Sequence, residues 1–390
     1  MTSSLWKRPR LRDDEEEREV SWLELFYDLV FVILIFVLAH LLEGQVSWEG
    51  VFAFGLLFVP VWWVWMVPTL YNDRFGTDDL SHRLFTFLLM VPIVGLAIAV
   101  PEGLGELSTA FALSYIAARA ILLLMWVRAG WHDPAARPLT TRLAIGFSIS
   151  LLPWVISVFV PAPARFILWT IGLSIEVLTP LITIVRIQTR VPVFSTAYLS
   201  ERYALFTVIV LGEIVISVVR GAAESDHPRL ATGIACALGL ALAFSLGWVY
   251  FDNVRNRLVK PGLLWATLRG YLHLPLLMGL TALGAGVAKV IVHEEGVPTA
   301  PTRWLICGAL AFALITIGVI ELTGARDRST DRSFRWSIVV RFAAGAIALL
   351  LGLAGRLDLF VLLSLLVLLC VGQMMLSLYL RFAVPGRDTR

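Results

Sequence analysis

Runs of about 20 mostly apolar residues recur along almost the whole chain, and this feature limits its fold more than any other. A helix needs about 20 such residues to cross the hydrocarbon core of a bilayer. Exposed to water, so much apolar surface would aggregate. The sequence therefore predicts an all-α, polytopic transmembrane helix bundle with 12 spans. The spans are expected near 21–43, 49–71, 82–101, 107–128, 142–160, 165–187, 202–220, 229–251, 263–291, 303–323, 337–355 and 358–381.

The overall composition agrees with a membrane location. Hydrophobic residues make up 58% of the 390 positions and charged residues only 16%, against about 25% charged residues in a soluble domain. The 32 basic residues nearly balance the 29 acidic ones, so nucleic acid is not an expected partner. The three cysteines form no CxxC pair, and no cofactor-binding motif is present. We expect no cofactor, and the bilayer is the predicted partner.

The distribution of basic residues predicts the orientation in the membrane. Alternate connections between the 12 spans were assigned to opposite sides. One side, which includes both termini, then holds 24 of the 32 basic residues, and the other holds six. Arg119 and Arg341 lie inside or at the edge of spans. Lysine and arginine are enriched on the cytoplasmic side of membrane proteins, so we predict a multi-pass plasma-membrane protein with both termini in the cytoplasm.

Three sequence similarities, in the same order in both halves, favour an internal duplication. Span 1 with span 7, span 2 with span 8 and span 3 with span 9 share acidic, aromatic and asparagine–aspartate positions. Transporters are often built from such repeats, so we predict a parallel 6+6 repeat. The predicted segments are a charged cytoplasmic tail (1–20), two six-helix halves (21–195 and 196–382) and a second cytoplasmic tail (383–390).

Ionisable side chains within the spans are the first candidates for function, because the hydrocarbon core disfavours them. Four lie near the middle of their spans: Arg119, Glu176, Glu213 and His273. Glu213 has no charged residue within six positions. It must therefore be protonated, bind a cation or pair with a base, for which Arg119 is the candidate. These four residues are predicted to line a central substrate- or proton-binding site.

Prolines accompany two of these residues. Pro180 follows Glu176, where a local break in the helix would hydrate the carboxyl group, and Pro275 follows His273. A proline removes one backbone hydrogen bond and frees a carbonyl group. His273 is thus either a proton or ligand site or a histidine with ordinary hydrogen bonds. The ninth span, which contains His273, is overlong and glycine-rich, and we expect it to tilt or break.

Two carboxylates near the start of span 1 form a second candidate group. Glu24 and Asp28 are four residues apart and share one helix face, so they would repel unless a cation, a proton or an arginine lies between them. Together with Glu201 they are predicted to line a cytoplasmic vestibule. The alternatives are that Glu24 caps its helix and that Asp28 pairs with Arg83 or Arg202.

An acidic loop follows span 2. Asp73, Asp78 and Asp79, with Arg83, Arg202 and Asp252, are predicted to form a cytoplasmic polar cluster. Acid-rich loops at a membrane face hold magnesium and a diphosphate in membrane prenyltransferases, but the spacing here does not match their NDxxD-type motif. The alternative is a solvated turn with a helix cap at Asp79 or Ser81. No metal-ligand motif identifies a metal.

Several of these segments carry a family resemblance. SWLELFYDLVFV (residues 21–32) and YLSERYALFTVIVLGE (198–213) resemble the two signatures of the bacterial low temperature requirement A family. WWVW (62–65), YNDRFGTDD (71–79) and YLHLPLLMG (271–279) are similar to further blocks of that family. Glu176 departs from an expected aspartate. The resemblance implies a bacterial multi-pass membrane protein linked by name to growth in the cold, without an established substrate or reaction.

The residues support three hypotheses for function. The first is a secondary transporter of an unidentified small solute, for which Glu213 is the candidate for proton coupling. The second is an intramembrane enzyme that acts on a lipid or isoprenoid at the cytoplasmic polar cluster, although no catalytic residue is assigned. The third is a non-catalytic envelope component. The oligomeric state is left open.

Overall fold

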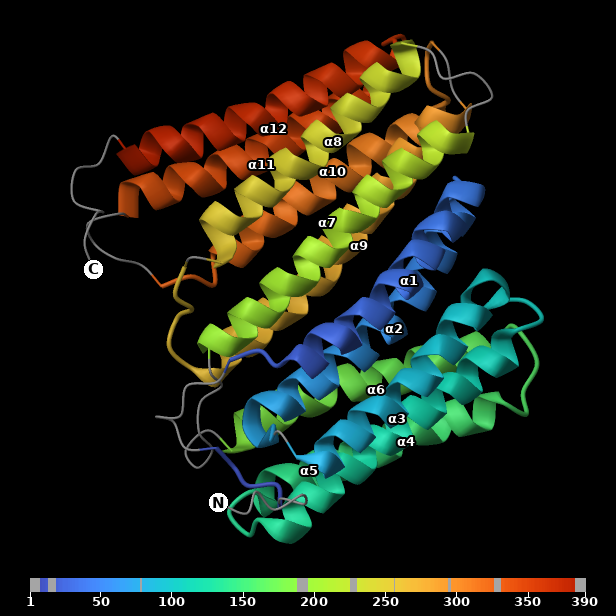
Figure 1. Cartoon of the computed structure of the whole chain (residues 1–390), viewed down its shortest axis with the longest axis vertical. Helices are drawn as coiled ribbons and strands as arrows, with labels where there is room; N and C mark the ends of the chain where they lie inside the picture. The colour runs from blue at the N-terminus through green and yellow to red at the C-terminus, as the bar shows by residue number, and fades with distance from the viewer. Residues whose placement is uncertain are drawn as a thin grey trace. The chain divides into compact units, whose positions relative to one another are not determined.

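The computed structural model describes residues 8–12, 19–77, 79–187, 196–224, 230–255, 257–293, 296–325 and 331–382. Within these residues the chain forms 12 α-helices and no named β-strand. They are α1 (Trp22–Gly44), α2 (Trp48–Phe75), α3 (Leu80–Ala99), α4 (Ser108–His132), α5 (Arg137–Ser157), α6 (Ala164–Ile187), α7 (Thr196–Glu224), α8 (Leu230–Tyr250), α9 (Leu263–His293), α10 (Ala300–Glu321), α11 (Asp331–Leu353) and α12 (Leu359–Phe382) (Figure 1). A 3₁₀ turn, η1 (Val100–Glu102), follows α3, and a π-helical turn, η2 (Phe251–Arg255), follows α8.

All 12 helices are long and apolar enough to cross a membrane. Each corresponds to one of the spans expected from the sequence, so the predicted all-α bundle with 12 spans is confirmed. Hydropathy locates such helices well, because in lipid every backbone polar group must be satisfied within the segment itself.

The outer face of α3 shows why the chain requires a bilayer. Leu84, Phe87, Val91, Val94 and Ile98 recur at intervals of three or four residues and are each between 48% and 68% exposed. This spacing places them on one side of the helix. A continuous apolar stripe of this kind is stable when it faces lipid and prone to aggregation when it faces water.

Prolines do not interrupt the helices that carry candidate residues. Pro180 lies inside α6, and Pro275 lies inside α9. The break expected near Glu176 is therefore wrong, as is a break in the ninth span. At 31 residues, α9 is about 46 Å long, which exceeds a hydrocarbon core of about 30 Å.

The chain divides into two compact units. Unit 1 consists of Met1–Leu38, Ala53–Arg202 and Gly262–Thr267, and unit 2 of Ala39–Phe52, Tyr203–Pro261 and Leu268–Arg390. In unit 1, α3 contacts α4, α4 contacts α5 and α5 contacts α6; in unit 2, α10 and α12 contact α11, and α8 contacts α12 (Figure 1). The two six-helix halves and the internal repeat stay predictions.

Candidate functional site

Asp28 of unit 1, in the second turn of α1, accepts hydrogen bonds from two other helices. Two nitrogens of Arg202 in α7 donate to its two oxygens at 2.6 and 2.7 Å, and Trp65 Nε1 in α2 donates to Oδ1 at 2.8 Å. Both charged side chains are buried. Of the two partners predicted for Asp28, Arg202 is therefore the one observed. A two-pronged arginine–carboxylate pair is the strongest common form of ion pair.

Glu24 has a structural contact on each oxygen. The Ser21 hydroxyl accepts a hydrogen bond from the Glu24 backbone N–H at 3.3 Å, while Glu24 Oε2 accepts from the Ser21 N–H at 3.2 Å. This reciprocal pair is a capping box, which begins α1 at Trp22. Glu24 Oε1 accepts from the Tyr198 hydroxyl of α7 at 2.9 Å. The predicted helix-capping role of Glu24 is confirmed, and its carboxylate also joins α1 to α7.

Arg119 of α4 pairs with Glu176 of α6, and not with Glu213 as the sequence suggested. Arg119 Nε donates to Glu176 Oε1 at 2.5 Å, the Tyr115 hydroxyl donates to Oε2, and the Ser150 hydroxyl donates to Oε1 at 3.3 Å. The Arg119 guanidinium also lies 4.8 Å from the centre of the Phe147 ring. Three helices of unit 1, α4, α5 and α6, thus contribute to one buried pair whose charges are balanced.

Glu213, in the middle of α7 in unit 2, has a different environment. Its side chain is 1% exposed. Oε1 accepts a hydrogen bond from Ser217, one turn further along α7, at 2.5 Å, and Oε2 has no hydrogen-bond partner among the described residues. Gly284 of α9 lies against this oxygen, since a Cβ atom there would come within 2.6 Å of Oε2. A buried carboxyl group with one neutral donor is suited to holding a proton or a cation.

His273 of α9 has a hydrogen-bond partner on each ring nitrogen. Nδ1 lies 2.7 Å from the Arg269 carbonyl oxygen, and Nε2 lies 3.0 Å from the Tyr250 hydroxyl. A carbonyl oxygen can only accept, so Nδ1 donates, and in a neutral ring Nε2 accepts from Tyr250. Tyr203 stacks on the ring at a centroid distance of 4.5 Å. This geometry matches the ordinary-hydrogen-bond alternative for His273.

A second α1–α7 ion pair lies near the other ends of these helices, within unit 2. Arg220 Nη2 donates to Glu43 Oε2, and His40 Nδ1 lies 3.4 Å from the same oxygen. In both α1–α7 pairs the acid is on α1 and the arginine on α7. Glu43 and Arg220 were not among the site residues predicted from the sequence. Their positions at the ends of spans made them look like ordinary interfacial charges.

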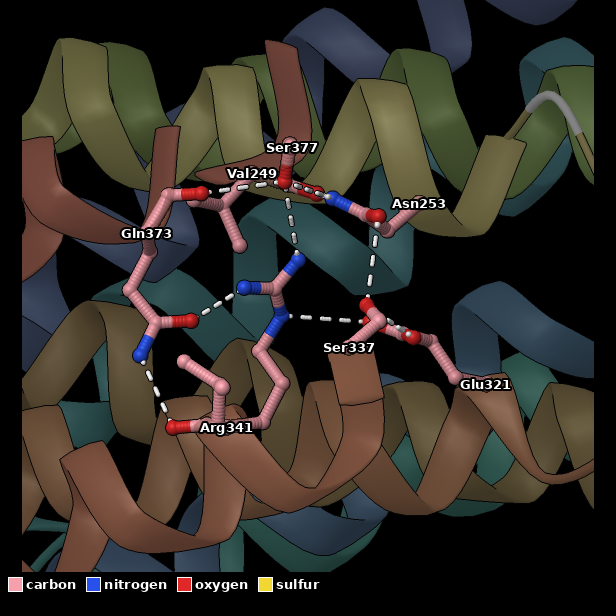
Figure 2. A network of polar contacts seen from close by, with 8 residues as sticks. Val249, Asn253, Glu321, Ser337, Arg341, Gln373 and Ser377 are labelled. Carbon is pink, nitrogen blue, oxygen red and sulfur yellow. Dashed lines mark hydrogen bonds and ion pairs between the residues drawn. The ribbon is translucent and has the colours of Figure 1, made fainter. Parts of the chain in front are cut away.

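A third buried ion pair joins four elements of unit 2 (Figure 2). Arg341 of α11 donates through Nε to Glu321 of α10 at 3.1 Å and through Nη1 to the side-chain oxygen of Gln373 in α12. Ser337 donates to Glu321 at 2.8 Å, and Asn253 of η2 donates to Ser377 at 3.2 Å. Gln373 and Ser377 carry no charge, so charge-based reasoning missed them.

Arg269, near the beginning of α9 in unit 2, is the other residue that sequence reasoning missed. It was counted among the basic residues at the membrane face, although it lies within the ninth span. Its side chain is 2% exposed, and its Nη2 donates to the Val254 carbonyl of η2. Its position four residues before His273, and hence on the same helix face, was the available signal.

The residues of the predicted cytoplasmic polar cluster have separate contacts. Asp73 pairs with Arg12 at 3.1 Å. Asp79 caps α3 by accepting from the Ser81 N–H at 3.1 Å, as the alternative interpretation predicted. The Arg83 guanidinium lies 5.8 Å from the centre of the Trp22 ring, and Asp252 accepts a hydrogen bond from Trp248 at 2.9 Å. Asp78 lies outside the described residues.

The four mid-span candidates do not form one cluster within a unit. Arg119 and Glu176 belong to unit 1, and Glu213 and His273 belong to unit 2. Glu201 is half-buried in α7 and adjacent to Arg202. Within the ranges that the structure describes, no group of three or more His, Cys, Asp or Glu side chains could hold a metal ion.

Twelve apolar helices with buried ion pairs among them define a multi-pass helical membrane protein. The family model for the bacterial low temperature requirement A protein (LtrA) matches residues 19–374. The chain belongs to this family. An uncharacterized protein of Rhizobium meliloti (strain 1021) is 28% identical to it over 303 residues, which cover 72% of each chain.

Proposed function

We propose that this protein is a secondary transporter that couples the movement of a small solute to protons, and that Glu213 is the residue that binds the proton. The observation that supports this most directly is the environment of Glu213. It is buried, and in the described ranges of the chain it accepts a hydrogen bond only from Ser217, while its second oxygen has no partner. An anion in such a place is strongly disfavoured. Binding and release of a proton would therefore accompany any change in its access to water.

The two α1–α7 ion pairs support the same proposal. Asp28 with Arg202 lies near the beginning of both helices, and Glu43 with Arg220 lies towards their ends. Alternating access requires that contacts at one side of the membrane open while those at the other stay closed. Pairs near opposite ends of the same two helices are suited to this role. On this proposal, one pair would open to each side in turn.

The experiment compares solute fluxes in cells that express the wild type or Glu213→Gln. Untargeted metabolite uptake and efflux would be measured with and without an imposed pH gradient. We expect a flux that depends on the gradient in the wild type and that is lost, or no longer follows the gradient, in Glu213→Gln. The glutamine keeps the shape of the side chain but cannot bind or release a proton.

Glu49→Gln provides a matched control, because Glu49 is an exposed carboxylate in the first turn of α2. It should behave like the wild type. Membrane levels of all three proteins must be equal for the comparison to apply. The transporter proposal is wrong if wild type and Glu213→Gln show the same fluxes under every condition.

A further inference from the structure

Arg269 is a buried cation without a balancing acid. Its Nη2 donates to the Val254 carbonyl, whereas Nε and Nη1, both buried, have no hydrogen-bond partner within the residues that the structure describes. In the described part of the chain, no carboxylate forms an ion pair with it. Three of its guanidinium N–H groups therefore lack an acceptor in an environment from which water is excluded.

The other deeply buried arginines differ from Arg269 in this respect. Arg119, Arg202 and Arg341 each contact a carboxylate, at distances of 2.5, 2.6 and 3.1 Å. Arg303 instead donates to the carbonyl oxygens of Gly352 and Pro298. An uncompensated charge is among the most destabilising features that a protein interior can hold. A ligand with negative charge would compensate the charge of Arg269.

The neighbours of Arg269 add no negative charge. His273 donates from Nδ1 to the Arg269 carbonyl, and Tyr250 bonds the opposite nitrogen of that ring. Tyr203 and Tyr250 carry uncharged hydroxyl groups, and the half-buried Arg257 is a further cation that acts on the guanidinium. Arg257 reinforces the positive potential. The charges that surround the Arg269 guanidinium are therefore positive or absent, an environment that favours an anion.

We propose that Arg269 binds the oxyanion of a solute, either a carboxylate or a phosphate group. This inference rests on the proposed transport function and gives the solute its chemical class. Guanidinium nitrogens match both kinds of oxyanion through paired, charge-assisted hydrogen bonds. Arg269 is the seventh residue of α9, about 10 Å along the helix from its beginning. This places it within the third of the span next to the predicted cytoplasmic face.

The π-helical turn η2 connects the anion site to the network in Figure 2. The Val254 carbonyl of η2 accepts from Arg269, and the preceding residue, Asn253, bonds to Ser377. π-Helical turns are frequent at functional sites. An oxyanion that draws the guanidinium away from Val254 would free this carbonyl and so act on the turn. Binding at Arg269 would in this way reach α11 and α12.

The anion site and Glu213 complement one another in charge. Gly284, which lies against Glu213, is 15 residues beyond Arg269 on α9, a separation of about 22 Å along the helix. A monoanion at Arg269 together with one proton at Glu213 carries no net charge. Symport of the two would move the solute without work against the membrane potential.

Binding would be measured by calorimetry on the full chain purified in a neutral detergent. The probes are sodium acetate and sodium phosphate, each compared with sodium chloride at equal ionic strength. We expect acetate, phosphate or both to bind the wild type with heat beyond that of chloride. Arg269→Gln should bind about 10- to 100-fold more weakly, since charge-assisted hydrogen bonds contribute about 1.5–3 kcal/mol. A response to acetate alone identifies a carboxylate, and one to phosphate alone identifies a phosphate.

Arg142→Gln is the matched control, because Arg142 is an exposed arginine of α5 in unit 1 and its loss removes the same charge without altering the site. It should bind like the wild type. Without anion, Arg269→Met should melt no lower than the wild type, since it removes an unpaired charge. If Arg269→Gln does not fold, Arg269→Lys is used in the binding experiment instead. A lysine keeps the charge but lacks the paired N–H donors of the guanidinium group.

Three results would overturn the anion site: neither probe binds beyond chloride, Arg269→Gln or its replacement binds as well as the wild type, or Arg269→Met melts far below the wild type. A loss of anion binding with Glu213-dependent flux intact removes this inference alone. An absence of flux under every condition removes the proposed transport function, even where anions bind.

Discussion

Buried carboxyl groups in this protein are of two kinds, those that pair with an arginine and those that do not. Asp28, Glu176 and Glu321 each contact an arginine within 3.1 Å, so each pair is electrically balanced. Glu213 accepts only from a serine. A paired carboxylate stabilises its partner, whereas Glu213 is the carboxyl group proposed to carry the proton. Substitution should therefore separate stability from function among residues that look alike in the sequence.

Glu176→Gln should destabilise the protein far more than Glu213→Gln. The first change leaves Arg119 as a buried, unpaired cation, which costs about 3–5 kcal/mol. The second leaves no charge behind, and Ser217 can still donate to the amide oxygen. Melting temperatures of the purified variants in detergent would measure the difference. Equal losses, or a larger loss for Glu213→Gln, would mean that Glu213 has a buried cationic partner.

The pair between Asp28 and Arg202 should show strong coupling in a double-mutant cycle. Asp28→Asn leaves the Arg202 guanidinium unpaired, and Arg202→Met leaves the carboxylate with only Trp65 as its hydrogen-bond donor. The double variant removes both charges and should recover part of the stability lost by either single variant. We expect a coupling free energy of about 0.5–3 kcal/mol from denaturation of the four proteins. Additive losses would show that the pair contributes no net stability.

Among the described helices, α9 is the longest, and two of its glycines lie close to neighbouring helices. Gly286 faces α10, where an added Cβ would come within 2.7 Å of Ile306 Cγ1. Gly284 faces α7 instead, and its added Cβ would meet the flexible carboxyl end of Glu213. Small residues allow membrane helices to pack closely. Two glycines two positions apart therefore serve different neighbours, one in packing and the other beside the proposed proton site.

Alanine at these two positions should affect different properties of the protein, stability at Gly286 and proton-coupled flux at Gly284. Gly286→Ala should lower the melting temperature, because overpacking against Ile306 costs about 1–3 kcal/mol. Gly284→Ala should change stability less but impair proton-coupled flux, because the carboxyl group must turn away from its present position. Melting curves and the flux assay on the same preparations would distinguish them. Normal flux in Gly284→Ala would show that the position of the Glu213 carboxyl group does not matter for coupling.

The 12 helices could be predicted from the sequence, but the partners of their polar residues could not. Hydropathy is a local property, so each span is visible in its own residues. Pairing depends on which helices pack together, and Arg119 was accordingly assigned to Glu213 when it contacts Glu176. For Asp28 the sequence offered two candidate partners, Arg83 and Arg202. Arg202, which lies at the same depth in its span as Asp28 does, is the one observed. The depth of a residue in the membrane can be counted along the sequence, whereas the helices that pack beside it cannot be read from the sequence.

Uncharged members of polar networks were the most difficult to predict. Gln373 and Ser377 lie in an otherwise apolar span, and only the packing of α12 against α8 and α11 gives them their partners. Arg269 was missed for the opposite reason. It was treated as one more basic residue near a membrane face, although six residues of α9 precede it. A charge placed this far into a helix should be examined for burial before it is counted as a topology signal.

The orientation of the chain gives the last prediction. The excess of basic residues assigns both termini to the cytoplasm. Gln45, in the connection between α1 and α2, should then face the outside, and Ala135, between α4 and α5, should face the cytoplasm; both residues are exposed. Single cysteines at these positions, in a background where Cys236, Cys307 and Cys370 are replaced by serine, can be labelled with a membrane-impermeant maleimide.

Gln45→Cys should react in intact cells, and Ala135→Cys should react only after the membrane is permeabilised. The cysteine-free background without either substitution is the control for unspecific labelling. The reverse pattern would place both termini outside. Because α2, α3 and α4 separate the two positions, labelling of both from the same side would require that one of these helices does not cross the membrane. Such a result would also reverse the direction in which every later span crosses the membrane, including α7 with Glu213 and α9 with Arg269.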